Sequence, residues 1–227
     1  MGGGAAPPPF GDPLHLMADD RPVRIPVFPL AGALLFPRAQ LPLHIFEPRY
    51  RAMVRDSLAG DRLIGMIQPR GSGEPPDLFD VGCLGRIEAA EELEEGRFNI
   101  VLEGLGRFRI LREASVDTVY RQVDADRREF DDLAEPEPLG LAQRAEIERE
   151  ARRYADALGY SVDWDAVTRL DDEMLVNAIA QVAPFDVGSK QALLEAPDIA
   201  ERCDLLVQFM QFQQMVPGGA EGPETLQ

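Results

Sequence analysis

The chain has 227 residues, of which 45% are hydrophobic, so it can build one large domain or two small ones around a packed core. Its formal net charge of −17 repels phosphate backbones and argues against nucleic-acid binding as the main role. No apolar run approaches the ~20 residues of a membrane-spanning helix, and the N-terminus lacks the basic and apolar regions of a signal peptide. We therefore expect a cytoplasmic protein.

After a Gly- and Pro-rich tail, predicted to be disordered over residues 1–20, the chain is expected to be β-rich up to residue 124. Residues 25–56 form an apolar, Pro-rich stretch. Its pattern changes from strand-like to helical periodicity at Pro48, a favourable first residue of a helix. A helix is therefore predicted over residues 48–59, with Gly60 behind it as a C-cap. Short strands are predicted at residues 23–30, 41–46, 63–67, 81–87, 98–104, 105–111 and 119–123.

Glycines and polar loops punctuate these strands. Gly82 and Gly85 lie inside one strand, where glycine marks a bulge or a close approach of two backbones. A Pro- and Gly-rich loop over residues 69–82 is long enough to be mobile, and a charged turn at 91–96 joins the strands of a hairpin. Several short strands with glycine corners favour a partly closed antiparallel β-barrel over residues 21–124.

An acidic, Pro-bearing linker is expected over residues 125–138, and everything after it has helical periodicity. A helical bundle is predicted over residues 139–216, followed by a disordered tail over residues 217–227. The chain is thus predicted to be an α+β protein, with the barrel first and the bundle second. The expected helices cover residues 138–158, 163–170, 171–183, 186–195 and 197–213, with Gly159 closing the first and Asp163, Asp171 and either Asp186 or Ser189 capping the next three.

The Pro-rich stretch also carries a sequence signature. Its characteristic residues are Phe28-Pro29-Leu30, Leu35-Phe36-Pro37, Pro42-Leu43, Ile45 through Tyr50, Met53 and Asp56. This pattern resembles the opening of the N-terminal, substrate-binding domain of the ATP-dependent Lon proteases, and most of all the variant found as a free-standing protein. VGCLGRI and GRFNIVLEGLGRFRI resemble the middle of that domain, and LVN, APFDVGSKQALLE and ERCDLL resemble its helical part, so the similarity covers roughly residues 23–214.

The resemblance implies a PUA-like β-barrel with one covering helix, followed by a helical bundle. It also implies a module that binds unfolded or peptide-like protein segments, as an accessory to proteolysis or protein quality control. The ATPase and protease modules of Lon are not expected here, because the chain stops where the ATPase would begin.

The residues themselves predict no enzyme activity, no cofactor and no metal site. A phosphate-binding loop requires GxxxxGK[ST], and the only Gly-x-Lys, at Gly188, lacks the upstream glycine. Adjacent helical residues point about 100° apart, so Ser189 and Lys190 are interpreted as a helix cap and a surface charge rather than a catalytic dyad. Cys83 and Cys203 are expected to be reduced, small apolar fillers of the core.

Several charged residues have both a structural and a functional interpretation. Glu47 and Arg49 either contact a peptide or form a helix cap and an ion pair. Arg107 and Arg109 share one strand face and are either simply exposed or an anion-contacting patch. His44 is expected to be a strand residue that makes one hydrogen bond. The carboxylate runs Glu91-Glu92, Glu94-Glu95 and Asp131-Asp132 are predicted to be solvated turns.

A binding role has to come from exposed apolar side chains, because unfolded proteins expose hydrophobic groups and unpaired backbone. Leu78 and Phe79 stand out, since they interrupt a polar loop, whereas Phe36, Phe46 and Tyr50 are either binding residues or core residues. The predicted peptide- or partner-binding residues are Phe36, Phe46, Arg49, Tyr50, Leu78 and Phe79.

The leading hypothesis is a non-catalytic protein that captures polypeptide segments by hydrophobic contact and by adding a strand to an open sheet edge. A protease or chaperone is the expected protein partner, with no nucleic acid and no membrane. The alternative is a small-molecule or nucleotide sensor that uses a pocket of the barrel. RNA binding is a third class of function, which the negative charge disfavours.

Overall fold

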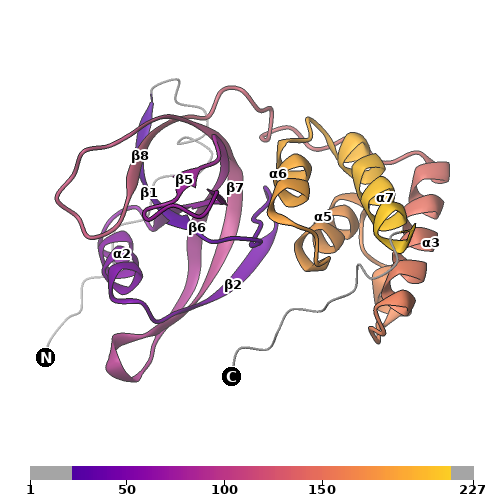
Figure 1. The fold of residues 1–227 in the computed structure, drawn as a ribbon, viewed down its shortest axis with the longest axis horizontal. Helices are drawn as coiled ribbons and strands as arrows, with labels where there is room; N and C mark the ends of the chain where they lie inside the picture. Colours follow the sequence, from indigo (N-terminus) through magenta and orange to yellow (C-terminus); the bar gives the residue numbers. More distant parts are fainter. Residues whose placement is uncertain (1–21, 216–227) are drawn as a thin grey trace, which may run out of the picture.

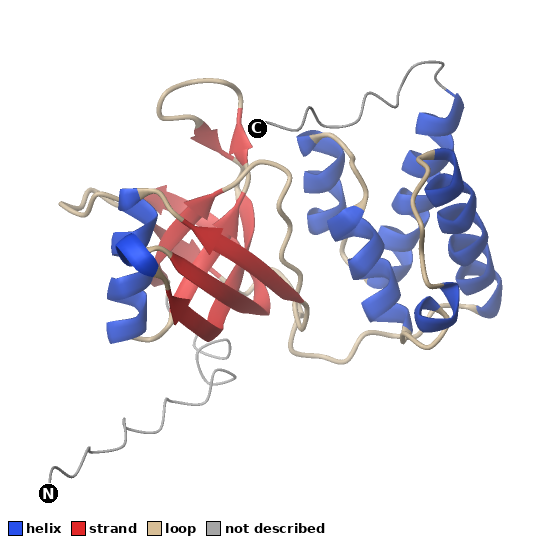
Figure 2. Ribbon diagram, turned by 90° about the horizontal axis from the view of Figure 1, so that it is seen from below, coloured by secondary structure: helices blue, strands red, loops and turns tan. Residues whose placement is uncertain are grey.

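The computed structural model describes residues 22–215, and the predicted tails at 1–20 and 217–227 lie outside the described residues. A β-sheet part and a helical part lie side by side, and α2 covers the side of the sheet away from the other helices (Figures 1 and 2). The predicted α+β class, with strands first and helices second, is confirmed. The strands are β1 (Val23–Pro29), β2 (Gln40–Ile45), β3 (Leu63–Ile67), β4 (Pro69–Arg70), β5 (Asp77–Leu78), β6 (Val81–Glu92), β7 (Phe98–Glu113) and β8 (Gln122–Asp126). The helices are α2 (Pro48–Ala59), α3 (Leu141–Ala157), α4 (Trp164–Val167), α5 (Asp172–Val182), α6 (Val187–Glu195) and α7 (Ile199–Met215), with a 3-10 turn η1 (Glu94–Gly96).

Five strands close into a ring, and β2 is attached outside it. The sheet order is β2-β7-β6-β3-β1-β8, and a further pairing of β7 with β8 closes the ring. The predicted barrel was expected to be antiparallel throughout, but β1 and β3 run parallel. The physical reason is the connection, because β2 and α2 intervene between the two strands and allow β3 to start again from the same end. The result is a ring-like mixed sheet rather than a strict antiparallel barrel.

β7 is the backbone of the ring, and it corrects the predicted strand boundaries. Two strands were expected over residues 98–111, but they form one strand of 16 residues. Its first half pairs with β2 and its second half with β8, while β6 runs along most of its other edge. One long strand is needed because β2 and β8 pair with different positions along β7. β8 also begins at Gln122 rather than at residue 119, and Val119 is exposed.

The ring interior and the space outside it are filled by separate groups of core side chains. Val27, Leu84 and Phe108 belong to the cluster inside the ring, and each is fully buried. A larger cluster lies outside and joins the ring to α2 and to the helical part. Cys83 and Cys203 are buried within it as free thiols, which confirms their prediction as small apolar fillers.

Three helices, α4, α5 and α6, begin at their predicted caps. Asp163, Asp171 and Asp186 each accept a hydrogen bond from the backbone N–H three residues ahead. Of the two candidates for the start of α6, Asp186 is therefore the cap, and Ser189 donates its hydroxyl to the Asp186 carboxylate. Asp198 performs the same role before α7, where its carboxylate accepts from the N–H of Glu201. These caps satisfy N–H groups that an isolated helix end leaves unpaired.

A buried ion pair connects the ring to the helical part, and it contradicts two predictions. Arg107 was expected to be exposed and Asp132 to lie in a solvated turn, yet only 3% and 6% of their surfaces are accessible. The Arg107 guanidinium donates to the Asp132 carboxylate at 2.8 Å and to the carbonyl of Ala196 at 2.6 Å. The linker thus folds back over β7, because a carboxylate is required to neutralise the buried cation. Arg109 remains half-exposed and pairs with Glu129.

Polar side chains of α6 form a second connection to the ring. Lys190 was predicted to be a surface charge, but it is buried and its ammonium donates to the carbonyls of Gly32 (2.7 Å) and Gln181 (2.9 Å). Burial lowers the pKa of Lys190. Beside it, Gln191 donates to the carbonyl of Val81 and accepts from Gln68. Because these groups are buried and hydrogen-bonded, they fix the helical part against the ring.

Candidate functional site

β2 has an open edge, since β7 is its one strand neighbour among the described residues. The carbonyl of Ala39 accepts from the N–H of Gly104 on β7, whereas the carbonyl of Gln40 accepts from the side chain of Gln181 on the opposite side. Backbone groups alternate in direction along a strand. The carbonyls of Pro42 and His44 and the N–H of His44 therefore point to the free edge.

Side chains along β2 alternate in the same register. Leu41 and Leu43 are half-buried and Ile45 is buried, while Gln40, Pro42 and His44 are exposed. Proline has no N–H, so it is tolerated where that group would point away from the ladder. Pro42 thus removes one donor from the open edge, which limits unrestricted pairing with other strands.

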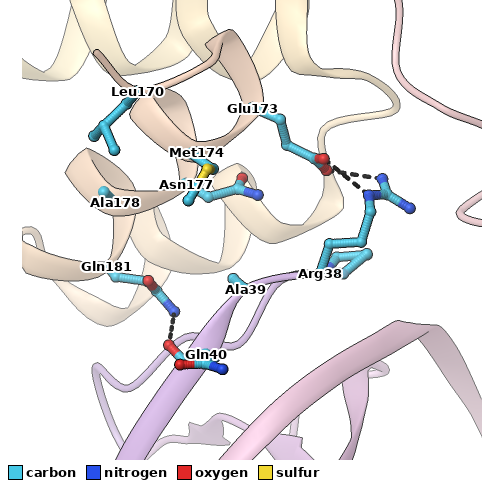
Figure 3. A pocket seen from close by; sticks show the side chains of 10 residues that line it. Arg38, Ala39, Gln40, Leu170, Glu173, Met174, Asn177, Ala178 and Gln181 are labelled. Carbon is cyan, nitrogen blue, oxygen red and sulfur yellow. Dashed lines mark hydrogen bonds and ion pairs between the residues drawn. The ribbon is translucent and has the colours of Figure 1, made fainter. Parts of the chain in front are cut away.

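A hollow of about 420 Å³ lies where the start of β2 meets α5 (Figure 3). Arg38 and Glu173 close one end with a two-pronged ion pair at 2.8 Å, and Gln181 reaches the Gln40 carbonyl at the other. Met174 lies on the wall and is 57% exposed. The side-chain hydrogen bonds that Arg38 donates to the Glu173 carboxylate raise the pKa of Arg38 further above its usual value. This end of β2 thus has a charged boundary and an apolar wall.

A second hollow of about 460 Å³ lies further along β2, over β7 and β6. His44, Asn99 and Glu91 form a hydrogen-bonded row on its surface, with distances of 2.8 Å and 3.3 Å. The predicted single hydrogen bond of the His44 side chain is thus confirmed. We call β2, from Gln40 to His44, together with these two hollows the β2 trough.

Phe46 follows the trough and is 61% exposed. Its ring lies 6.2 Å from the ring of His44. Arg49, also exposed, pairs with Glu47, whose side chain forms no cap hydrogen bond with α2. Of the predicted binding residues, Phe46 and Arg49 therefore lie on the surface at the α2 end of the trough.

The other predicted binding residues lie elsewhere. Phe36 and Tyr50 have 0% and 6% of their surface accessible, so both belong to the core. The Arg202 guanidinium covers the Phe36 ring at 4.4 Å. Leu78 is half-buried against the ring interior, and Phe79 is half-buried with Arg70 stacked over it at 5.9 Å. Leu78 ends β5 of the small β4–β5 hairpin and Phe79 follows it, and neither residue lines the β2 trough.

Sequence reasoning missed the contribution of α5. Met174, Asn177 and Gln181 line the trough, although they lie far from β2 in the sequence, on α5. Their pattern is that of an ordinary amphipathic helix, so it gives no signal of a site. The Pro42 position, in contrast, was a usable signal, because proline within a strand pattern indicates an edge strand.

The arrangement offers hydrogen-bonding backbone and apolar surface, which suit binding of an extended chain. Within residues 22–215, no three Asp, Glu, His or Cys side chains gather as metal ligands, and no helix is long and apolar enough to cross a membrane.

Curated relatives match over nearly the whole described chain. Lon protease 2 of Sorangium cellulosum is 30% identical over 201 residues, which is 81% of this chain and 24% of that protein. Lon protease of Salinispora arenicola is 32% identical over 189 residues, 81% of this chain and 23% of that protein. The chain thus spans about a quarter of the length of these relatives.

Solved structures share the fold. A Lon N-terminal domain protein from Xanthomonas campestris matches with a TM-score of 0.61 and 22% identity, over 83% of this chain and 99% of that chain. The N-terminal domain of a Mycobacterium avium complex Lon protease matches with a TM-score of 0.59 and 20% identity, over 83% of this chain and 98% of that chain. A family model described as the ATP-dependent protease La (LON) substrate-binding domain matches residues 24–211. The predicted resemblance is thus confirmed, and the chain belongs to the family of Lon substrate-binding domains.

Proposed function

We propose that this protein binds extended polypeptide segments, here called clients, by adding them as a strand to the free edge of β2. The observation that carries the proposal is the open edge with outward-pointing backbone groups at Pro42 and His44, flanked by two hollows. The family's substrate-binding role supports it. Strand addition gives affinity through main-chain hydrogen bonds and specificity through side-chain pockets.

Main-chain hydrogen bonds to β2 alone supply too little free energy to bind a client. From Pro42 to His44, three main-chain groups point to the free edge, the Pro42 carbonyl and the N–H and carbonyl of His44, and are available to a client. At about 1 kcal/mol net for each hydrogen bond, they supply roughly 3 kcal/mol, which is less than a millimolar complex requires. Apolar contacts with Phe46 and Met174, both more than half exposed, provide further binding energy.

The proposal includes a non-catalytic, cytoplasmic role beside a protease or chaperone, to which the client is presented. The matched domain is the substrate-binding part of Lon, which supports binding rather than catalysis. The alternative of a sensor with a pocket inside the barrel gains no support, because Phe108, Leu84 and Val27 fill the ring interior.

A pair of substitutions at one residue tests the proposal. His44→Pro removes the outward N–H without touching the ladder to β7, whereas His44→Val removes the side chain and keeps the N–H. With a fluorescent synthetic peptide of alternating valine and arginine, we expect His44→Pro to weaken binding about five- to tenfold, and His44→Val to leave it within twofold. Fluorescence anisotropy measures the affinities, and thermal melts confirm that both variants fold.

Phe46→Ser is the matching test of the apolar contact, with Leu111→Ser as its control, because Leu111 is 52% exposed on β7 and does not line the trough. We expect only Phe46→Ser to weaken binding. Equal binding by His44→Pro, His44→Val and the unmodified protein would contradict strand addition at β2.

A further inference from the structure

An apolar cleft of about 160 Å³ opens in the helical part, on the side of α5 away from the β2 trough. Every lining side chain is aliphatic, aromatic or a methionine. Its rim is open, since Tyr160 is 50% exposed and Val182 is 73% exposed. The lining residues are Ala151, Tyr154, Ala155, Tyr160, Val162, Trp164, Val167, Leu170, Leu175, Ala178, Ile179, Val182, Ala183 and Met210.

The cleft and the trough are neighbours across one helix. Leu170 and Ala178 line both of them. Along α5, Met174 and Gln181 line the trough, and Ile179 and Val182 line the cleft. A chain that leaves the Gln40 end of the trough therefore meets the cleft after crossing α5.

From this continuity we propose that the cleft takes one large apolar side chain of the same client that pairs with β2. The inference rests on the proposed function and adds a sequence requirement to it. A helix is about 10 Å across and an extended chain advances about 3.3 Å per residue, so the anchoring side chain lies about three to four residues beyond the one beside Gln40.

Size and polarity both favour a phenylalanine or leucine anchor. An apolar protein cavity of about 150 Å³ holds benzene, so the volume of this cleft suits one phenyl ring. The lining has no charged side chain to compensate a buried charge, so aspartate or lysine is rejected at the anchor position. The expected client is an extended segment with an aromatic or branched aliphatic residue at a fixed distance from its strand.

Two peptides and two double variants test the inference. The peptides share a strand of alternating valine and arginine, and carry either phenylalanine or serine four residues beyond it, on the side that reaches α5. The cleft variant is Tyr160→Ser with Val182→Ser. The matched control is Leu141→Ser with Phe212→Ser, which removes two exposed apolar side chains (91% and 67% exposed) that do not line the cleft.

We expect the unmodified protein and the control to bind the phenylalanine peptide about tenfold more tightly than the serine peptide. The cleft variant is expected to bind both equally. Equal binding of the two peptides by the unmodified protein would overturn the proposed anchoring of a side chain in the cleft. If His44→Pro still weakened binding of both peptides in that case, strand addition at β2 would hold without the anchor. Binding of neither peptide would instead overturn the proposed function.

Other occupants of the cleft give different results. Sedimentation velocity of the unmodified protein and the cleft variant tests whether a second copy of this chain occupies the cleft. The association state would depend on Tyr160 and Val182 only if the cleft were the interface between copies. A phenylalanine peptide that binds His44→Pro as tightly as it binds the unmodified protein would show a separate site and overturn the shared client.

Discussion

At the scale of single residues, the buried charges at the junction have the largest predicted effects. Arg107 lies on β7 and is buried, and among the described residues its carboxylate partner is Asp132 of the linker. Removing one partner of a buried pair leaves an uncompensated charge. The two groups therefore depend on each other.

We predict that Asp132→Ala lowers the free energy of unfolding by about 3–5 kcal/mol. The neighbouring Asp131 is exposed and provides the matched control, since Asp131→Ala is expected to change stability by less than about 0.5 kcal/mol. Urea unfolding followed by tryptophan fluorescence measures both. Similar stabilities of the two variants would contradict the buried ion pair between Arg107 of β7 and Asp132 of the linker.

A second residue-scale prediction concerns acid stability. Asp124 accepts hydrogen bonds from Arg24 and Arg112, and these, the Arg24 bond foremost, lower its pKa to about 2. A carboxyl whose folded-state pKa is depressed stabilises the fold above its unfolded pKa of about 3.9, and this contribution is lost as the pH falls to about 2.

Asp124→Asn is accordingly expected to flatten the loss of stability between about pH 4 and pH 2. Asp117→Asn, at an exposed position in the turn before β8, is expected to leave the profile unchanged. Thermal melts across this pH range measure the difference. Parallel profiles for the Asp124 variant and the unmodified protein would contradict the assignment.

Sequence reasoning failed at several single residues for one physical reason. Lys190, Arg107 and Asp132 look like surface charges because their partners are distant in the chain, up to 158 residues for Lys190 and Gly32. Burial of a charge is decided by those partners and not by its neighbours in sequence. Phe36 and Tyr50 were ambiguous for a related reason, because an aromatic residue suits both a core and a binding surface.

At the scale of elements, β7 and the turn into β2 determine where the trough lies. A Cβ atom added at Gly104 would meet the carbonyl oxygen of Phe36 at 1.9 Å. Gly104 also exchanges backbone hydrogen bonds with Arg38 and Ala39, at 2.8 Å and 2.9 Å. This contact between backbones fixes the start of β2 against the ring, so only glycine fits.

Gly104→Ala is predicted to destabilise the fold by about 3 kcal/mol, because the backbone must move to relieve the overlap. At Gly140, the N-cap of α3, the nearest atom to an added Cβ is 3.9 Å away, so Gly140→Ala meets no overlap and is expected to cost less than about 1 kcal/mol, the penalty of alanine at a helix cap. Chemical denaturation compares the two. Equal stability of both variants would show that the Phe36 turn is not held closely against β7.

Local signals predicted some elements well and long-range pairing determined the others. The bounds of α2 and the caps Asp163, Asp171 and Asp186 were predicted because each depends on residues within one turn. The fusion of two expected strands into β7 and the parallel pairing of β1 with β3 depend on partners elsewhere in the sheet. No local pattern contains that information.

At the scale of the whole molecule, β2 lies on the side of the ring that faces the helical part (Figure 1), and the first hollow of the β2 trough lies between β2 and α5. One core cluster extends through both parts, and Arg107, Lys190 and Gln191 connect them with buried hydrogen bonds. The two walls of this hollow, β2 and α5, are therefore held at a fixed separation. A client meets a preformed site, which reduces the entropy lost on binding.

The most direct test of this account is the exchange rate of individual β2 amide hydrogens, measured by NMR with and without saturating valine–arginine peptide. The His44 N–H points to the open edge, whereas the Leu43 N–H already faces β7. We predict that the peptide slows exchange at His44 at least tenfold and leaves Leu43 unchanged. Unchanged exchange at His44 while the peptide is bound would contradict strand addition at β2.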